Sequence, residues 1–252
     1  MDPKDRIILP LDVSSAQEAQ KLVDKLTGHV GMFKIGLELI YSIMASLLVE
    51  ENADAIGALR FFRNLMKSIS GAHEFLDTKL ADIPNTVGKA SLAVSSMGVK
   101  FFNVHASAGL KAIEAAVANR GLSQVLGVTV LTSIGEEECR DSIFGDVPGK
   151  KVLYFAKMLK KAGASGIICS PQELVLLREN HELDDLLIVT PGVRPEWAST
   201  DDQKRVMTPG EAIKAGADYL VIGRPITKPP ESVGSPVDAA KRIADEIQAA
   251  LS

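Results

Sequence analysis

Short apolar runs alternate with amphipathic stretches along the whole chain. The apolar runs are typical of strands that are buried on both faces of a parallel sheet. They predict eight strands, at Arg6–Val13, Met32–Glu38, Glu74–Lys79, Phe101–His105, Val125–Leu131, Gly166–Cys169, Leu186–Thr190 and Tyr219–Gly223. The amphipathic stretches predict the helices, at Ser15–Leu26, Ile40–Ser68 (with a break inside it left open), Thr86–Met97, Gly109–Asn119, Lys150–Lys161, Pro171–Glu179, Pro209–Ala215 and Val237–Leu251.

This alternation predicts an α/β fold. Eight strand–helix units in 252 residues match the number and the length of a (β/α)8 TIM barrel. No Pro- or Ser-rich linker divides the chain, so we expect residues 1–252 to form a single domain. An open doubly wound sheet would place a glycine-rich turn after the first strand, where this chain has Leu11-Asp12-Val13-Ser14-Ser15. The barrel is therefore the favoured fold.

Composition and charge narrow the classes of function. The formal net charge of −4 and the pI near 5.7 argue against nucleic-acid binding, although one local basic site can still hold a phosphorylated small molecule. The N-terminal residues contain no apolar signal-peptide core, and the longest uncharged run, Gly121–Gly135, is shorter than the ~18 residues that a membrane span needs. Cys139 and Cys169 lack the spacing of a metal or redox motif. We expect a cytoplasmic protein that contacts no membrane and has no metal site.

Ionisable residues interrupt two of the predicted strands. In the second strand, alternation turns Lys34 towards the barrel lumen, where an unpaired ammonium would be very costly. In the third strand, Asp77 and Lys79 are two positions apart and share one face at the carboxyl rim, and Asp82 follows in the loop. TIM-barrel active sites lie at this rim. The four residues could form a cluster of alternating charge.

The residues alone leave two interpretations of this cluster open. One is a catalytic array, and the other is a salt-bridge network at the mouth of a barrel, since structural ion pairs also place charges in such positions. Asp12, at the end of the first strand, has the same two readings, because a single Asp there also serves as a helix cap.

The last two strands carry a pattern that suits a phosphorylated ligand. The seventh strand runs into Gly192-Val193-Arg194, and the eighth ends at Gly223-Arg224. Glycine lets a phosphate approach the backbone N–H groups, and arginine contacts two phosphate oxygens at once. TIM barrels frequently bind phosphate at this place.

At these residues the chain resembles the orotidine 5′-phosphate decarboxylase family. The motif that carries the resemblance is Phe75-Leu76-Asp77-x-Lys79-x-x-Asp82-Ile83-Pro84-Asn85-Thr86. Further matching segments follow in family order and cover nearly the whole chain: Leu11-Asp12, Phe33-Lys34-Ile35-Gly36-Leu37-Glu38, Asn103-Val104-His105-Ala106, Val130-Leu131-Thr132-Ser133, Pro191-Gly192-Val193-Arg194-Pro195, Asp202-Gln203-Lys204-Arg205 and Ile222-Gly223-Arg224-Pro225.

The resemblance implies a reaction and a role for each matching residue. The reaction is the decarboxylation of orotidine 5′-monophosphate to uridine 5′-monophosphate, without a cofactor, in de novo pyrimidine synthesis. Lys79 would protonate C6 of the pyrimidine, within a charged catalytic array of Lys34, Asp77, Lys79 and Asp82. Substrate would be bound at the ribose by Asp12, Lys34 and Thr86, at the pyrimidine by Thr132 and Ser133, and at the phosphate by Arg194, Gln203, Gly223 and Arg224. The Arg194–Arg205 loop would close over the phosphate.

The resemblance also implies a homodimer, in which Asp82 and Thr86 reach the site of the partner subunit. One segment departs from the family pattern, because the connection at about residues 40–73 is longer than usual. Two alternatives remain at this point. One is a metal-dependent sugar-phosphate decarboxylase or aldolase, which resembles the same Asp-x-Lys-x-x-Asp segment, and the other is a phosphate-binding barrel without catalysis.

Overall fold

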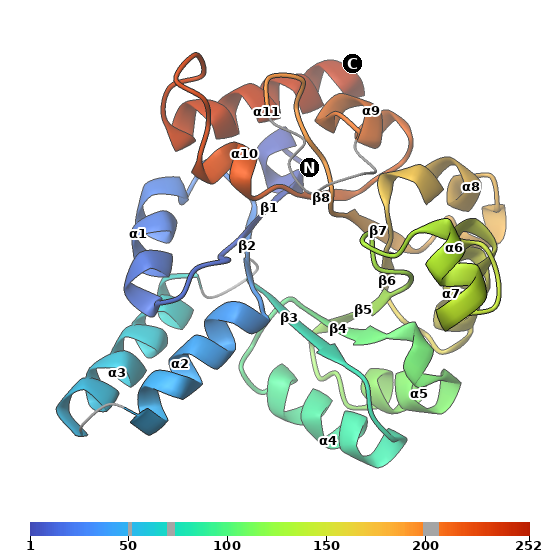
Figure 1. Ribbon diagram of the computed structural model, residues 1–252, viewed down its shortest axis with the longest axis horizontal. Helices are drawn as coiled ribbons and strands as arrows, with labels where there is room; N and C mark the ends of the chain where they lie inside the picture. The colour runs from blue at the N-terminus through green and yellow to red at the C-terminus, as the bar shows by residue number, and fades with distance from the viewer. Residues whose placement is uncertain (50–51, 70–73, 199–206) are drawn as a thin grey trace.

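The computed structural model describes residues 1–49, 52–69, 74–198 and 207–252. Within these residues, eight parallel strands close into a barrel in which each strand pairs with its neighbour in sequence and β8 pairs with β1. The strands are β1 (Ile7–Pro10), β2 (Met32–Ile35), β3 (Glu74–Leu80), β4 (Phe101–His105), β5 (Gln124–Val128), β6 (Gly166–Ile168), β7 (Leu187–Thr190) and β8 (Tyr219–Val221). Figure 1 shows the helices around the outside of this ring. The predicted (β/α)8 TIM barrel is confirmed.

The helical layer contains one helix more than expected between β2 and β3. The predicted Ile40–Ser68 helix is two helices, and the first begins three residues earlier than expected. The helices are α1 (Ala16–Leu26), α2 (Leu37–Val49), α3 (Asn52–Ser68), α4 (Pro84–Ser95), α5 (Leu110–Ala118), α6 (Glu136–Glu138), α7 (Pro148–Lys161), α8 (Leu174–Arg178), α9 (Pro209–Lys214), α10 (Arg224–Thr227) and α11 (Pro236–Leu251). Five short turns of other helix types join them: η1 (Pro3–Arg6), η2 (Ala106–Ala108), η3 (Cys139–Ile143, π-helical), η4 (Pro171–Glu173) and η5 (His181–Leu183).

The lengthened connection lies outside the barrel. Helix α3 packs against α1 and α2 on the outside of the barrel, and the strands remain paired in order (Figure 1). Among the helices in the described ranges, none combines the length and the apolar character that crossing a bilayer requires.

Several strands end earlier than the apolar pattern predicts. The first stops at Pro10 instead of Val13, and the second stops at Ile35 because Leu37 already begins α2. Leu11 and Leu39 are fully buried even so. Apolar residues beyond a strand end pack beneath the helices, and periodicity cannot separate them from the strand itself.

A separate group of apolar side chains fills the barrel lumen at its amino end. Its rings meet edge to face, with centroids 6.1 Å apart for Phe75 and Phe101 and 5.5 Å apart for Phe101 and Tyr219. All members are almost completely buried: Ile8, Met32, Phe75, Phe101, Leu126, Val189 and Tyr219. We call this group the lumen floor. The larger core lies on the opposite face of the same strands, between the barrel and the helices.

Side-chain caps fix several helix starts. The Ser15 hydroxyl accepts the Glu18 N–H at the start of α1. At α11, Ser235 and Asp238 form a capping box, in which each side chain accepts the backbone N–H of the other. These caps satisfy N–H groups that have no partner within the helix.

Two glycines give opposite expectations for the same substitution. Gly127 of β5 faces α7, and a Cβ atom there would lie 2.1 Å from Cδ2 of the buried Leu159, whereas a Cβ at Gly57 inside α3 would meet nothing within 4 Å. We expect Gly127→Ala to lower the free energy of unfolding by roughly 1–3 kcal/mol because the packed layer must rearrange. We expect Gly57→Ala to raise it by about 0.5–1 kcal/mol because alanine favours the helix. Urea denaturation measures both, and changes of the same sign would contradict this packing.

Candidate active site

A cavity of about 240 Å³ opens at the carboxyl end of the barrel. Successive side chains of a strand point to opposite faces, so the residue two positions after each member of the lumen floor also points into the lumen. The residues placed in this way all line the cavity: Pro10, Lys34, Asp77, Asn103, Val128, Pro191 and Val221. The cavity therefore lies directly on the lumen floor, at the end of the barrel where TIM-barrel enzymes carry their active sites.

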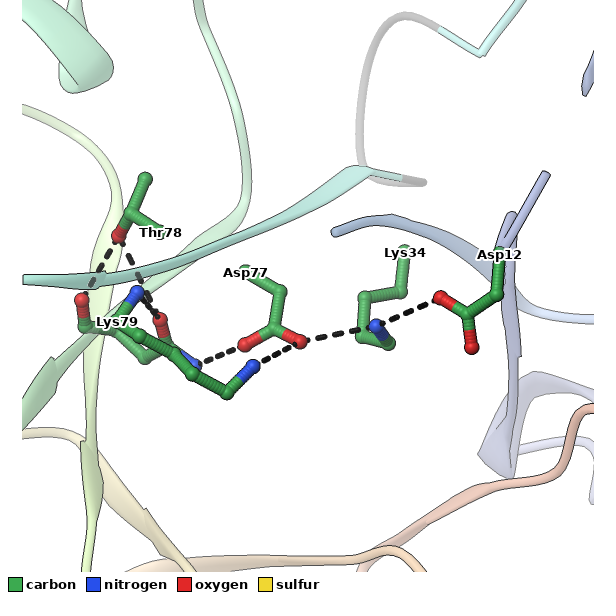
Figure 2. A network of polar contacts seen from close by, with 6 residues as sticks. Asp12, Lys34, Asp77, Thr78 and Lys79 are labelled. Atoms are coloured by element: carbon green, nitrogen blue, oxygen red, sulfur yellow. Dashed lines mark hydrogen bonds and ion pairs between the residues drawn. The ribbon is translucent and has the colours of Figure 1, made fainter. Parts of the chain in front are cut away.

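A row of alternating charges forms the polar wall of this cavity (Figure 2). The Asp77 Oδ2 atom lies 2.9 Å from Lys34 Nζ and 2.6 Å from Lys79 Nζ. Lys34 Nζ also lies 3.5 Å from Asp12 Oδ1. The structure thus brings Lys34, Asp77 and Lys79 together and adds Asp12 at the end of the row.

The charges of this row stabilise one another. Burial by itself raises the pKa of Asp77, but Lys34 and Lys79 outweigh burial and lower that pKa to about 2. Burial by itself lowers the pKa of Lys34, but Asp77 and Asp12 outweigh it, and the pKa of Lys34 rises above its ordinary value. Asp77 is therefore a carboxylate and Lys34 an ammonium at neutral pH.

Of the two lysines, Lys79 is the one that a ligand can reach. Its side chain is 30% exposed, whereas those of Lys34 and Asp77 are 11% and 8% exposed. An ammonium has three hydrogens, and the contact with Asp77 leaves others of Lys79 for a bound molecule. Lys79 can therefore donate a proton into the cavity.

A bulge in β3 places Lys79. Leu76 pairs with Phe102, and Leu80 pairs with Val104, so four steps along β3 correspond to two steps along β4. Among the described residues other than glycine, Lys79 alone has a positive φ, of 48°. This left-handed conformation is unfavourable for a side chain with a Cβ atom. Strand alternation alone does not predict it.

Three of the sequence-predicted residues, Asp82, Thr86 and Ser133, line neither this cavity nor the groove that adjoins it. Asp82 is exposed, and its Oδ1 atom accepts the N–H of Ile83 at 2.6 Å instead of contacting Lys34 or Lys79. Thr86, in the first turn of α4, is also exposed, as is Ser133. None of the three lines the cavity, whereas Thr132 does.

A second, wider groove of about 830 Å³ adjoins the cavity and holds the predicted phosphate-binding residues. Arg194, Gly223 and Arg224 all line it. Arg194 is buried, and its Nη1 atom donates to the Val193 carbonyl at 3.0 Å, whereas Arg224 is exposed. The groove and the cavity share four lining residues, Pro10, Asp12, Pro191 and Val221. They therefore form one continuous depression with Asp12 at the junction.

Gln203 lies outside the described residues, as does most of the predicted Arg194–Arg205 loop. In the part of the chain that the structure describes, no three His, Cys, Asp or Glu residues gather as a potential metal-binding group.

Asn103 of β4 also belongs to this site, although the sequence matched it only as part of the Asn103-Val104-His105-Ala106 segment and gave it no role. Its Nδ2 atom donates to Asp77 Oδ1 at 2.6 Å, and its Oδ1 atom accepts the backbone N–H of Lys79 at 2.6 Å. A signal was available, because Asn103 follows Phe101 by two positions and is polar where a buried strand should be apolar.

Comparison with known proteins agrees with this geometry. A family model described as Orotidine 5′-phosphate decarboxylase / HUMPS family matches residues 5–243. The orotidine 5′-phosphate decarboxylase of Heliobacterium modesticaldum is 42% identical over 264 aligned residues, which cover 100% of this chain and 99% of the relative. That of Geobacter sp. strain M21 is 44% identical over 253 residues, which cover 97% of this chain and 96% of the relative.

A solved structure gives the same result. The crystal structure of orotidine 5′-phosphate decarboxylase from Lactobacillus acidophilus superimposes with a TM-score of 0.75 at 33% sequence identity, and the match covers 96% of this chain and 98% of that one. Both the sequence and the fold match over nearly their full lengths, so the chain belongs to the orotidine 5′-phosphate decarboxylase / HUMPS family.

Proposed function

We propose that this protein removes the C6 carboxylate of orotidine 5′-monophosphate and releases uridine 5′-monophosphate and carbon dioxide, as a step of pyrimidine synthesis. The observation that carries the proposal is the Lys79 ammonium, held by the Asp77 carboxylate at 2.6 Å on the wall of a cavity at the carboxyl end of the barrel. The names of the relatives with about 40% identity support the same substrate. A cytoplasmic location stays a prediction from composition.

The continuous depression fits a nucleotide in three parts. The cavity has a largely apolar lining with one charged wall, which suits a flat base whose reactive edge meets Lys79. Asp12 lies at the junction, where its carboxylate can accept hydrogen bonds from the ribose hydroxyls. In the groove, Arg194 and Arg224 supply positive charge for the phosphate.

The chemistry follows from the position of the Lys79 ammonium. Cleavage of the C6–carboxylate bond leaves an electron pair on C6, and carbon dioxide departs. The ammonium stabilises the negative charge on C6 as it forms and then transfers a proton to C6, and water returns a proton to the neutral amine. Asp77 and Lys34 contribute by fixing that ammonium before the substrate arrives, so that no reorganisation is needed during the reaction.

The metal-dependent alternative from the same superfamily is less well supported. That chemistry uses a carboxylate-bound cation to stabilise an enediolate. The relatives with about 40% identity have the name of the nucleotide enzyme, which favours orotidine 5′-monophosphate as the substrate. The decrease in ultraviolet absorbance of orotidine 5′-monophosphate, measured with and without a chelator, separates the two: activity that survives the chelator supports the proposal, and activity on sugar phosphates alone overturns it.

Two substitutions separate catalysis from substrate binding. We expect Lys79→Ala to reduce the decarboxylation rate on the order of 10³-fold or more, because it removes both the charge and the proton donor, while uridine 5′-monophosphate still binds through the groove. We expect Arg224→Ala to raise KM sharply, because it weakens the contact with the phosphate. Absorbance kinetics and calorimetry with the product provide the measurements. Near-native turnover in Lys79→Ala, or an unchanged KM in Arg224→Ala, would remove the residue from its assigned role.

We further propose that the active unit is a homodimer in which Asp82 and Thr86 act in the site of the partner subunit. Both residues are exposed and neither lines the cavity of its own chain. Ile83, between them, is 65% exposed, and Leu37 and Tyr41 of α2 are 40% and 63% exposed. A second copy that covers these side chains would bury them and bring its own Asp82 towards the lysines.

A heterodimer of two inactive variants tests this arrangement. Lys79→Ala and Asp82→Asn subunits with different affinity tags are co-expressed, and the mixed dimer is purified through both tags. One of its two sites then contains a native Lys79 and a native Asp82, so we expect about half of the native activity per dimer.

The matched control pairs a Lys79→Ala subunit with a subunit that carries both substitutions, because this dimer has no complete site. A mixed dimer as inactive as the control would refute the sharing of Asp82, and a monomer in solution would refute the dimer itself.

A further inference from the structure

The β3 bulge leaves Asp77, Thr78 and Lys79 without regular pairing to β4, and Asn103 takes over the contacts that are lost. The Lys79 N–H donates to the Asn103 side-chain Oδ1 at 2.6 Å, and the Thr78 hydroxyl donates to the Asn103 backbone carbonyl at 2.8 Å. A buried N–H group without a partner is costly, so these contacts make the bulge tolerable.

The same amide group orients the catalytic carboxylate. Asn103 Nδ2 donates to Asp77 Oδ1 at 2.6 Å, while both ammonium groups contact the other oxygen, Oδ2. A neutral donor on Oδ1 directs Oδ2 towards Lys34 and Lys79. Asn103 is itself fully buried, so its side chain has little freedom to rotate away.

We propose that Asn103 is a positioning residue. It holds the Lys79 backbone in its left-handed conformation, and it holds the Asp77 carboxylate where Oδ2 contacts both lysines. The inference rests on the proposed decarboxylase function. Asn103 does not exchange a proton with the substrate. It acts through Lys79 and Asp77, and the rate depends on it because the Lys79 ammonium must lie close to C6.

The proposal predicts that Asn103 affects turnover more than binding. Phosphate and ribose contacts come from the groove and from Asp12, which do not depend on the bulge. A misplaced Lys79 lowers the rate of the chemical step, and a misplacement of about 1 Å costs on the order of 10²-fold. In Asn103→Ala we therefore expect kcat to fall by this order while KM and the affinity for uridine 5′-monophosphate stay close to native.

The pH profile gives a second readout that a purely structural role would not move. Asp77 is faced by Lys34 from β2, by Lys79 on its own strand and by Asn103 and His105 from β4, with Asp12 behind Lys34. Loss of the Asn103 donor removes a hydrogen bond to the charged form of Asp77 and raises the pKa of that carboxyl. The fall of kcat at acid pH should therefore begin at higher pH in the variant than in the native enzyme.

Two variants and one control complete the experiment. Asn103→Ala removes both side-chain contacts. Asn103→Asp keeps the size of the side chain and an acceptor for the Lys79 N–H, but it replaces the N–H donor to Asp77 with a carboxylate oxygen, which repels the Asp77 carboxylate. Ser123→Ala is the control, because Ser123 is buried and its hydroxyl donates to the Val99 carbonyl at 2.6 Å, next to the amino ends of β5 and β4. Thermal melting of all three gives the loss of stability against which the loss of turnover is compared.

The outcomes are distinct. A drop in kcat with native KM and a shifted acid limb in the Asn103 variants, with a native profile in Ser123→Ala, supports the proposal. Native kcat in the Asn103 variants, equal losses in Ser123→Ala, or failure of both Asn103 variants to fold overturns it and leaves the decarboxylase function standing. A native enzyme without activity on orotidine 5′-monophosphate overturns the function and this inference with it.

Discussion

The site depends on one carboxylate shared by two ammonium groups. Asp77 sits in the lumen between Lys34 and Lys79, and the buried charges of Asp77 and Lys34 would each be very costly without the other. Removing water from a set of charges is favourable only when each has a close partner in good geometry. The lumen floor below, the bulge in β3 and the amide of Asn103 all serve to provide that geometry.

This arrangement separates the tasks of the site along the depression. The interior end holds fixed charges on adjacent strands, and the outer end holds Arg194 and Arg224 on the connections after β7 and β8. The reaction proposed above uses no cofactor, so its rate enhancement must come from electrostatics and from binding energy at groups that do not react. A phosphate held in the groove is such a group, because its contacts can align a base that touches few polar atoms itself.

The sequence predicted much of the fold, because eight apolar runs at regular spacing leave few alternatives. Strand alternation also pointed Lys34 into the lumen and put Asp77 and Lys79 on one face at the carboxyl rim. Lys79 faces the same cavity for a different reason, since the bulge and the positive φ place it there. That bulge depends on Asn103, which lies 24 residues further along the chain, and local periodicity contains no information about such a contact.

Two other features could not be predicted from the sequence pattern: the division of the segment between β2 and β3 into two helices, and the role of Asp82. Helices α2 and α3 lie within one segment that was predicted as a single helix with a break left open. The polar run Glu50-Glu51-Asn52 at their junction is as typical of an exposed helix face as of a turn, so it did not decide between the two. Asp82 does not line the cavity of its own chain, and a residue that acts on a second copy leaves no mark in the pattern of one chain. The family resemblance supplied that reading, and the geometry of a single chain is compatible with it.

Each residue of the lumen floor is followed two positions later along the chain by a residue that lines the cavity. Because of this spacing, the strands tolerate insertion and deletion less well than the helices do. Loss of a single residue at the start of β3 would turn Leu76 and Thr78 towards the substrate, and Asp77 would face the helices instead. The connection between β2 and β3, by contrast, has accommodated an additional helix without changing which side chains enter the lumen. Insertions and deletions can therefore accumulate in the helices and loops outside this barrel. In the strands they cannot, because a change of one residue would exchange the side chains that face the lumen with those that face the helices.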